Sequence, residues 1–299
     1  MSEPSPAESD DESTAGREYS STVLGSDTHW WEYGPADGAV TMIAVHGFRG
    51  DHHGLEPVVR HLPGIRVISP DLPGFGESGV LPGRDHDVEA YAEWLIAFAE
   101  QLGFERTNVL GHSFGSIVVA AAVNAGLAAD RLILINPIAA PALRGPRAIM
   151  TRLAILYYRM GAVLPERLGQ ALLRSRLIVR VMSITMAKTR DRELRRFIHD
   201  QHDQYFSRFA SRDSLLEAFR TSVSHDVREY ASALSMPTLL IAAERDDISS
   251  VAAQQRLHRD IAESTLVIIP EVGHLIHYET PAAAAEQIVA FLEAAPERG

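Results

Sequence analysis

The sequence predicts an α/β fold in which a mostly parallel central sheet is flanked by helices and carries an inserted helical cap. Short apolar runs alternate with helix-like segments in both the amino-terminal and the carboxy-terminal part of the chain, which is typical of a parallel sheet covered on both faces. The stretch 139–230 interrupts this alternation, because it holds no convincing strand and is rich in helix-forming residues. We therefore expect one α/β body with a helical insertion.

The predicted strands are apolar runs bounded by turn residues. The run 40–45 is almost continuously apolar, as a strand buried on both faces should be. The full set of predicted strands is 19–24, 29–33, 40–45, 65–69, 108–110, 131–135, 238–242 and 265–269.

The predicted helices show apolar residues at helical spacing. In 87–102, the residues Val88, Tyr91, Leu95 and Phe98 share one face. The full set of predicted helices in the body is 55–62, 87–102, 116–125, 251–259 and 281–294.

These elements divide the chain into three parts. Residues 1–18 are rich in acidic residues, serine and proline, and we expect a disordered tail. Residues 19–138 and 231–299 form the α/β core, and 139–230 form the helical cap. No linker rich in glycine or serine separates the cap from the core, so it should pack on the core.

The charge of the chain is unevenly distributed. The 299 residues include 39 acidic and 28 basic side chains, a net charge of -11, which argues against nucleic acid as a partner. Residues 139–230 alone hold 17 Lys and Arg against 9 Asp and Glu, which leaves 11 against 30 elsewhere. A basic cap therefore sits on an acidic body.

The composition also excludes several kinds of chemistry. The chain has no cysteine, which rules out disulfides, thiolate metal sites and a cysteine nucleophile. The first 20 residues lack the basic start and apolar stretch of a signal peptide, and no apolar segment is long enough to span a bilayer. We expect a cytoplasmic protein.

A serine lies between two glycines in residues 111–115, Gly-His-Ser-Phe-Gly, after a predicted strand and before a predicted helix. Small flanking residues allow the sharp strand-to-helix turn that exposes a nucleophilic hydroxyl. The Gly-x-Ser-x-Gly pattern alone is weak, but its strand and helix context strengthens it. Such a serine also needs a base, a group that orients the base, and donors for an oxyanion.

With this turn, four further motifs resemble the α/β-hydrolase-fold superfamily, in its branch of capped serine hydrolases that includes esterases and carbon-carbon hydrolases. Residues 46–48 (His-Gly-Phe) resemble the oxyanion turn, and 71–78 (Asp-Leu-Pro-Gly-Phe-Gly-Glu-Ser) a structural loop of that family. Residues 243–248 (Ala-Glu-Arg-Asp-Asp-Ile) resemble the acid loop, and 273–274 (Gly-His) the base. The motifs occur in the order typical of the family and cover nearly the whole chain after the tail.

The resemblance implies a catalytic triad of Ser113, Asp246 and His274, with the backbone amides of Phe48 and Phe114 as the oxyanion hole. Asp247 is an alternative to Asp246 as the acid of the triad, and Asp246 matches the motif better. The sequence departs from the common pattern at Ala243 and at Ser116, where glycine is frequent; both residues are small, so we expect adjustment there. The mechanism requires no cofactor and no metal.

Several histidines could have either a structural or a functional role. His46 and His112 flank the serine, and local hydrogen bonding or packing is favoured over a role as base. His199 and His202 have the i, i+3 spacing of a helical metal site, but no partner cluster is evident. His52 and His53 are interpreted as a solvated loop.

The cap should determine the substrate. Its arginines are by default a solvated face, and the alternative is that some bind a substrate carboxylate. The candidate substrate contacts are Arg144, Arg147, Tyr157 and Tyr158.

We expect hydrolysis of a small-molecule carboxylic ester, including a monoester with a free carboxylate such as a monoalkyl phthalate. The alternatives are carbon-carbon bond hydrolysis of dienoic keto acids from ring cleavage and a non-catalytic ligand-binding role. The serine at position 113 argues against epoxide hydrolases and haloalkane dehalogenases, which use aspartate there.

Overall fold

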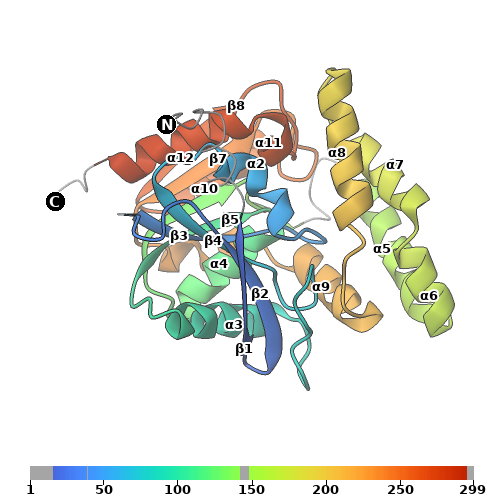
Figure 1. Cartoon of the computed structure of the whole chain (residues 1–299). Helices are drawn as coiled ribbons and strands as arrows, with labels where there is room; N and C mark the ends of the chain where they lie inside the picture. The colour runs from blue at the N-terminus through green and yellow to red at the C-terminus, as the bar shows by residue number, and fades with distance from the viewer. Residues whose placement is uncertain (1–15, 39, 142–147, 295–299) are drawn as a thin grey trace, which may run out of the picture.

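The computed structural model describes residues 16–38, 40–141 and 148–294. Its centre is a twisted eight-stranded sheet in the order β1-β2-β4-β3-β5-β6-β7-β8 (Figure 1). The strands are β1 (Arg17–Val23), β2 (Ser26–Tyr33), β3 (Val40–Val45), β4 (Ile65–Pro70), β5 (Thr107–His112), β6 (Ala129–Ile135), β7 (Thr238–Ala243) and β8 (Ser264–Ile269). The first two strands pair antiparallel, and β3 to β8 run parallel.

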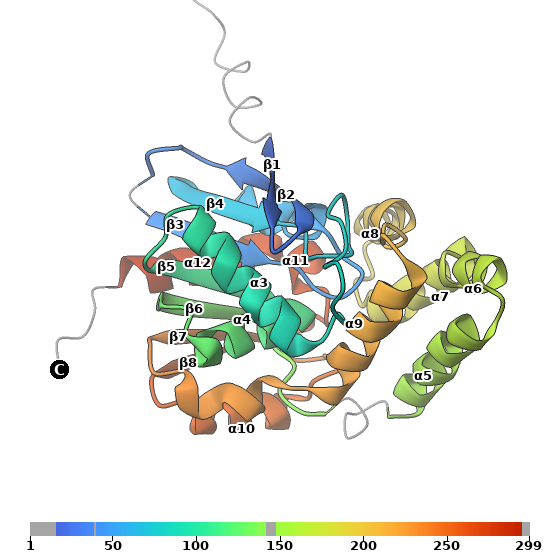
Figure 2. The same cartoon turned by 90° about the horizontal axis from the view of Figure 1, so that it is seen from below.

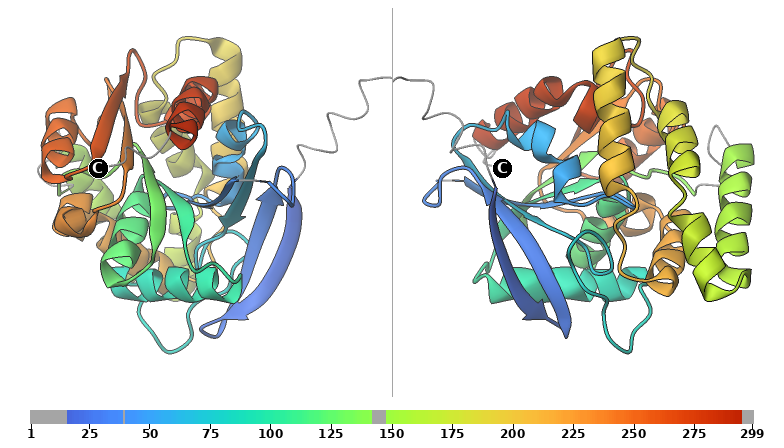
Figure 3. Two further views of the ribbon diagram at one scale, coloured as in Figure 1. Left: turned by 90° about the vertical axis from the view of Figure 1, so that its left-hand side faces the viewer. Right: turned by 45° about the vertical axis from the view of Figure 1, so that its right-hand side comes forward.

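Helices cover both faces of the sheet (Figures 2 and 3). On one face lie α3 (Val88–Gln101), α4 (Phe114–Ala125) and α10 (Val251–Asp260), and on the other lie α2 (Glu56–Val59) and α12 (Pro281–Glu293). A short 3-10 turn, η1 (His52–Gly54), precedes α2, and α11 (Ile276–Glu279) precedes α12. The carboxyl ends of the parallel strands therefore meet at one edge of the sheet, where loops converge.

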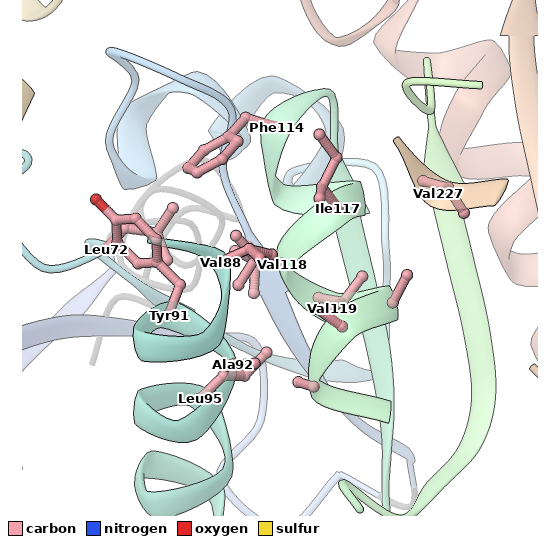
Figure 4. Close-up of a cluster of buried hydrophobic side chains, with 14 of the residues drawn as sticks. Leu72, Val88, Tyr91, Ala92, Leu95, Phe114, Ile117, Val118, Val119 and Val227 are labelled. Carbon is pink, nitrogen blue, oxygen red and sulfur yellow. The ribbon is translucent and has the colours of Figure 1, made fainter. Parts of the chain in front are cut away.

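The larger core cluster lies between α3, α4 and the sheet (Figure 4). The first ten residues of α4, from Phe114 to Val123, are all buried, and Tyr91 and Leu95 of α3 pack on them. Small residues in α4 let it approach the sheet closely. This packing fixes the start of α4, which is where the candidate nucleophile lies.

The helical insertion lies between β6 and β7. Its helices are α5 (Ala148–Val163), α6 (Glu166–Leu173), α7 (Arg176–Met186), α8 (Arg192–Tyr205) and α9 (Arg212–Ser224), followed by the 3-10 helix η3 (Val227–Ala233). Figures 1 and 2 show α5, α6 and α7 on the side of the insertion that faces away from the sheet. None of the helices in the described ranges has the length and apolar character needed to cross a bilayer.

The structure confirms the predicted fold class and corrects two details. The predicted tail, 1–18, lies mostly outside the described residues, but Arg17 and Glu18 belong to β1, where they pair with β2. The helix predicted at 55–62 is only four residues long, because Pro63 and Gly64, whose φ is +75°, turn the chain into β4.

Candidate active site

The turn at Ser113 explains both glycines of its motif. Ser113 has φ +53° and ψ -115°, a backbone conformation rare for a residue with a side chain, directly between β5 and α4. A Cβ on Gly115 would lie 2.3 Å from the carbonyl oxygen of Val45, and one on Gly111 would lie 2.6 Å from that of Gly115. Only glycine allows α4 to approach β3 and β5 this closely.

The structure brings the three candidate catalytic side chains into one hydrogen-bonded chain. The Oγ atom of Ser113 lies 2.7 Å from Nε2 of His274, and Nδ1 of His274 lies 2.9 Å from Oδ2 of Asp246. The side chains of His274 and Asp246 are 4% and 1% exposed, so bulk water does not compete for their hydrogen bond. This is the arrangement that a serine nucleophile, its base and the acid that orients the base require.

The surroundings of Asp246 favour its ionised form. Its Oδ1 accepts hydrogen bonds from the amides of Ile248 and Ser249, and its Oδ2 also accepts one from Nδ2 of Asn136. Burial alone would raise the pKa of Asp246, but the attraction and hydrogen bond of His274, with the hydrogen bonds from the Ile248 and Ser249 amides, outweigh it and hold the pKa below its usual value. Asp247 pairs with Lys188 of the insertion.

Asn136 was missed by the sequence interpretation. It follows β6, has φ +46°, and reaches Asp246 across the end of the sheet. No local motif marks it; the only available signal was that a polar residue directly follows an apolar strand in a fold whose strand ends form the site.

Two backbone amides are candidates for stabilising a developing negative charge. Phe114 is the first residue of α4, where an N–H has no acceptor within the helix. The Phe48 amide has no hydrogen-bond acceptor among the residues that the structure describes. Phe48 follows Gly47, where an added Cβ would lie 3.2 Å from Cβ of Ser113.

Comparison with known proteins identifies the family of the chain. Residues 42–287 match the family described as "Alpha/beta hydrolase family". The chain belongs to the alpha/beta hydrolase family. The match includes Ser113, Asp246 and His274.

Individual relatives of this alpha/beta hydrolase are distant. It is 27% identical to a "Dihydrolipoyllysine-residue acetyltransferase component of acetoin cleaving system" from Pseudomonas putida, with 88% of this chain aligned to 66% of that protein. It is 25% identical to a "Putative carbamate hydrolase RutD" from Variovorax paradoxus, over 85% of this chain and 91% of the relative. A solved thermophilic esterase from Thermogutta terrifontis shares 25% identity and a TM-score of 0.70, over 92% of this chain and 98% of the esterase.

A cavity of about 170 Å³ adjoins Ser113. It lies between the sheet edge and the insertion, and most of the surface of its walls is apolar. Met182 and Met186 of α7 and Phe206, just after α8, contribute from the insertion, and Leu55 and Ile248 from the body. No arginine or lysine is among the described residues that line it, whereas the carboxylate-bearing Asp51 is.

The candidate substrate contacts of the insertion are placed elsewhere. Arg144 and Arg147 lie outside the described residues. Tyr157 donates its hydroxyl hydrogen to the carbonyls of Leu172 and Leu173, and the hydroxyl of Tyr158 accepts a hydrogen bond from Arg49. Neither tyrosine lines the cavity beside Ser113.

The histidines near Ser113 take different roles. Nδ1 of His46 is hydrogen-bonded to the carbonyl of Gly47, and its Nε2 accepts a hydrogen bond from the amide of Leu72. These bonds fit the expectation that His46 makes local hydrogen bonds rather than acting as a base. His112 packs against His277 with ring centroids 4.1 Å apart, and burial, with the nearby His274, lowers its pKa to about 3. A neutral His112 adds no positive charge beside Ser113.

The other two histidine pairs make side-chain hydrogen bonds. His199 and His202 both place Nδ1 against Oγ of Ser183, at 2.6 and 2.7 Å, and so join α8 to α7. His52 is buried rather than solvated, because it stacks on Trp31 and its Nδ1 contacts Asp71. Ligand atoms of Asp51, His52 and His53 lie within 4.8 Å of one another, with Nδ1 of His52 against Asp71 and Nδ1 of His53 against Asp51.

Proposed function

We propose that this alpha/beta hydrolase is a serine esterase that cleaves small, uncharged carboxylic esters. The observation that carries the proposal is the continuous chain of contacts from Ser113 through His274 to Asp246. His274 takes the proton of Ser113 at Nε2 as the hydroxyl attacks the ester carbonyl, while Asp246 holds the ring in the required tautomer. The amides of Phe48 and Phe114 stabilise the oxyanion.

The same residues complete the reaction. His274 returns the proton to the departing alcohol, which leaves an acyl group on Ser113. Water, deprotonated by His274, then attacks this acyl-enzyme and releases the acid. Neither step requires a metal or an organic cofactor.

The cavity supports an uncharged substrate of limited size. A cavity of about 150 Å³ holds a benzene-sized group, so the space beside Ser113 suits a short or compact acyl or alcohol group. A free carboxylate would find no cation in the described lining and would face Asp51, whose Oδ2 is buried without a hydrogen-bond partner among the described residues. This argues against a monoester with a free carboxylate and against dienoic keto acids.

The test compares nitrophenyl esters of short acids with monoalkyl phthalates, in the wild type, Ser113→Ala and Asp51→Asn. We expect turnover of the uncharged esters, a loss of at least about 10³-fold in kcat/KM in Ser113→Ala, and a smaller preference for uncharged esters in Asp51→Asn. Preference of the wild type for the free acids would contradict the substrate class. Hydrolysis that survives in Ser113→Ala would contradict the mechanism.

A further inference from the structure

Large apolar side chains are exposed on the outer helices of the insertion. Most of the exposed large hydrophobic residues in the described chain belong to α5, α6, α7 and α8. On α5 and α7 they form two rows at helical spacing, which we call the cap stripe: Leu153, Leu156, Met160 and Val163, and Leu177, Val181 and Ile184. Val163 is 86% exposed and Leu177 is 74% exposed. Apolar rows of this kind mark a contact surface rather than scattered surface residues.

Basic residues accompany the cap stripe. From 148 to 186 the chain carries six arginines and one acidic residue, Glu166. Arg152, Arg159, Arg167 and Arg176 are exposed, and none of them forms an ion pair with another described residue. On α5, the spacing places Arg152 and Arg159 at the edge of the apolar row.

The combination of an apolar row with unpaired arginines favours one kind of partner. Amphipathic helices with apolar and basic residues bind bilayers that contain anionic lipid, because apolar burial and charge attraction add. A second copy of the chain fits less well, since a two-fold contact through this face would bring the same arginines together.

The place of α7 links this surface to the cavity. Leu177, Val181 and Ile184 lie on its outer side, whereas Met182 and Met186 line the cavity beside Ser113. Figures 1 and 2 place α5, α6 and α7 together on the outer side of the molecule. We propose that the cap stripe docks on a bilayer surface that contains anionic phospholipid, with α7 between the bilayer and the cavity.

The test uses the full chain with Ser113→Ala, so that hydrolysis cannot affect the measured binding. Sedimentation is measured with vesicles of phosphatidylcholine alone and of phosphatidylcholine with phosphatidylglycerol. We expect binding to the mixed vesicles, weaker binding without the anionic lipid, and weaker binding at about 0.5 M salt. Val181→Asp with Ile184→Asp should lower the partition coefficient at least about tenfold. Leu24→Asp, at an exposed apolar position outside the insertion, should not change it.

A charge variant keeps the test valid if the apolar variant misfolds. Arg159→Glu with Arg176→Glu should weaken binding roughly fivefold or more for each arginine, whereas Arg256→Glu with Arg259→Glu on α10 should have no such effect. Hydrolysis of a soluble nitrophenyl ester by the same variants, with Ser113 restored, reports whether they are folded. The proposal is wrong if the mixed vesicles do not sediment the protein, or if Val181→Asp with Ile184→Asp instead converts a dimer to a monomer.

Discussion

The guanidinium of Arg49 donates a hydrogen bond from Nη1 to the hydroxyl of Tyr158, 3.2 Å away. It thereby joins α5 to the loop after β3 that contains Phe48, which we call the candidate oxyanion loop. Its Nε and Nη2 donate to the carbonyls of Phe206 and Leu173, each at 2.8 Å. Arg49 directly follows Phe48, is buried and has φ +62°. One side chain therefore connects the loop of the candidate oxyanion donor to three separate segments of the insertion.

We predict that Arg49 is a positioning residue for the Phe48 amide. Because small displacements of a donor reduce catalysis strongly, Arg49→Met should lower kcat for a short uncharged ester by about 10- to 100-fold with little change in KM. Arg49→Lys should recover only part of this loss, since one ammonium group cannot reproduce the planar fork. Steady-state kinetics on folded variants provide the measurement.

Arg174 offers a matched control for Arg49. It lies 4.8 Å from the centre of the Phe209 ring, which Arg49 also approaches, and it donates to the carbonyl of Phe209, but it is not part of the oxyanion loop. Arg174→Met should therefore affect stability more than kcat. An equal loss of kcat in both variants would mean that Arg49 acts only by holding the insertion in place.

The two neighbouring aspartates should differ sharply in their effect on catalysis. Asp246→Asn would leave His274 without a carboxylate to fix its tautomer, so kcat should fall by about 10⁴-fold. Asp247→Asn should change kcat by less than about threefold, because Nδ1 of His274 is held by Asp246 and Asp247 pairs with Lys188. Comparable losses in the two variants would refute the assignment of Asp246 as the orienting acid.

The body of the protein could be predicted from sequence because each of its signals is local. Ser113, Asp246 and His274 each lie in a short motif just after a predicted strand, and parallel strands bring such positions to one edge. The structure places their side chains in contact, as reported above. The same local reasoning found the helical insertion, since a long stretch without strands is visible in composition alone.

The residues that line the cavity could not be predicted, because they depend on how the insertion packs against the body. Helical spacing shows that Met182 and Met186 share a face of α7, but not whether that face turns toward the body. Arg49 gives no local sign that its guanidinium enters the insertion. The sequence thus identified Tyr158 as a candidate substrate contact, whereas its hydroxyl binds Arg49.

The glycine after Phe114 should tolerate no side chain. In Gly115→Ala the new Cβ would meet the carbonyl oxygens of Val45 and His46 at 2.3 and 2.6 Å, both of them backbone atoms that cannot rotate away. We expect a loss of about 3 kcal/mol or more in the free energy of unfolding, measured by urea denaturation. Gly64→Ala is the control: its φ is +75° but no atom lies within 4 Å, so only backbone strain of about 1 kcal/mol should appear. Similar losses in both variants would argue against a close contact between α4 and β3.

Buried histidines should make the fold sensitive to mild acid. Burial lowers the pKa of His112 and of His202 to about 3, with His274 adding to the effect at His112 and His199 at His202. In the unfolded chain a histidine titrates near its ordinary pKa of about 6.5. As the pH falls below that value the unfolded state gains protons that the folded state does not, so stability is greatest above it and declines toward about pH 3.

The expected size of this effect is measurable. Between about pH 7 and about pH 5, each of these two histidines should lower the free energy of unfolding by about 2 kcal/mol. Urea denaturation of His202→Gln at both pH values should show about 2 kcal/mol less pH dependence than the wild type, whatever the change in stability at pH 7. His61→Gln, at an exposed position, should retain the dependence of the wild type. If His202→Gln retains it too, His202 is protonated in the folded protein as readily as in the unfolded chain, and its contact with Ser183 must then use the imidazolium as donor.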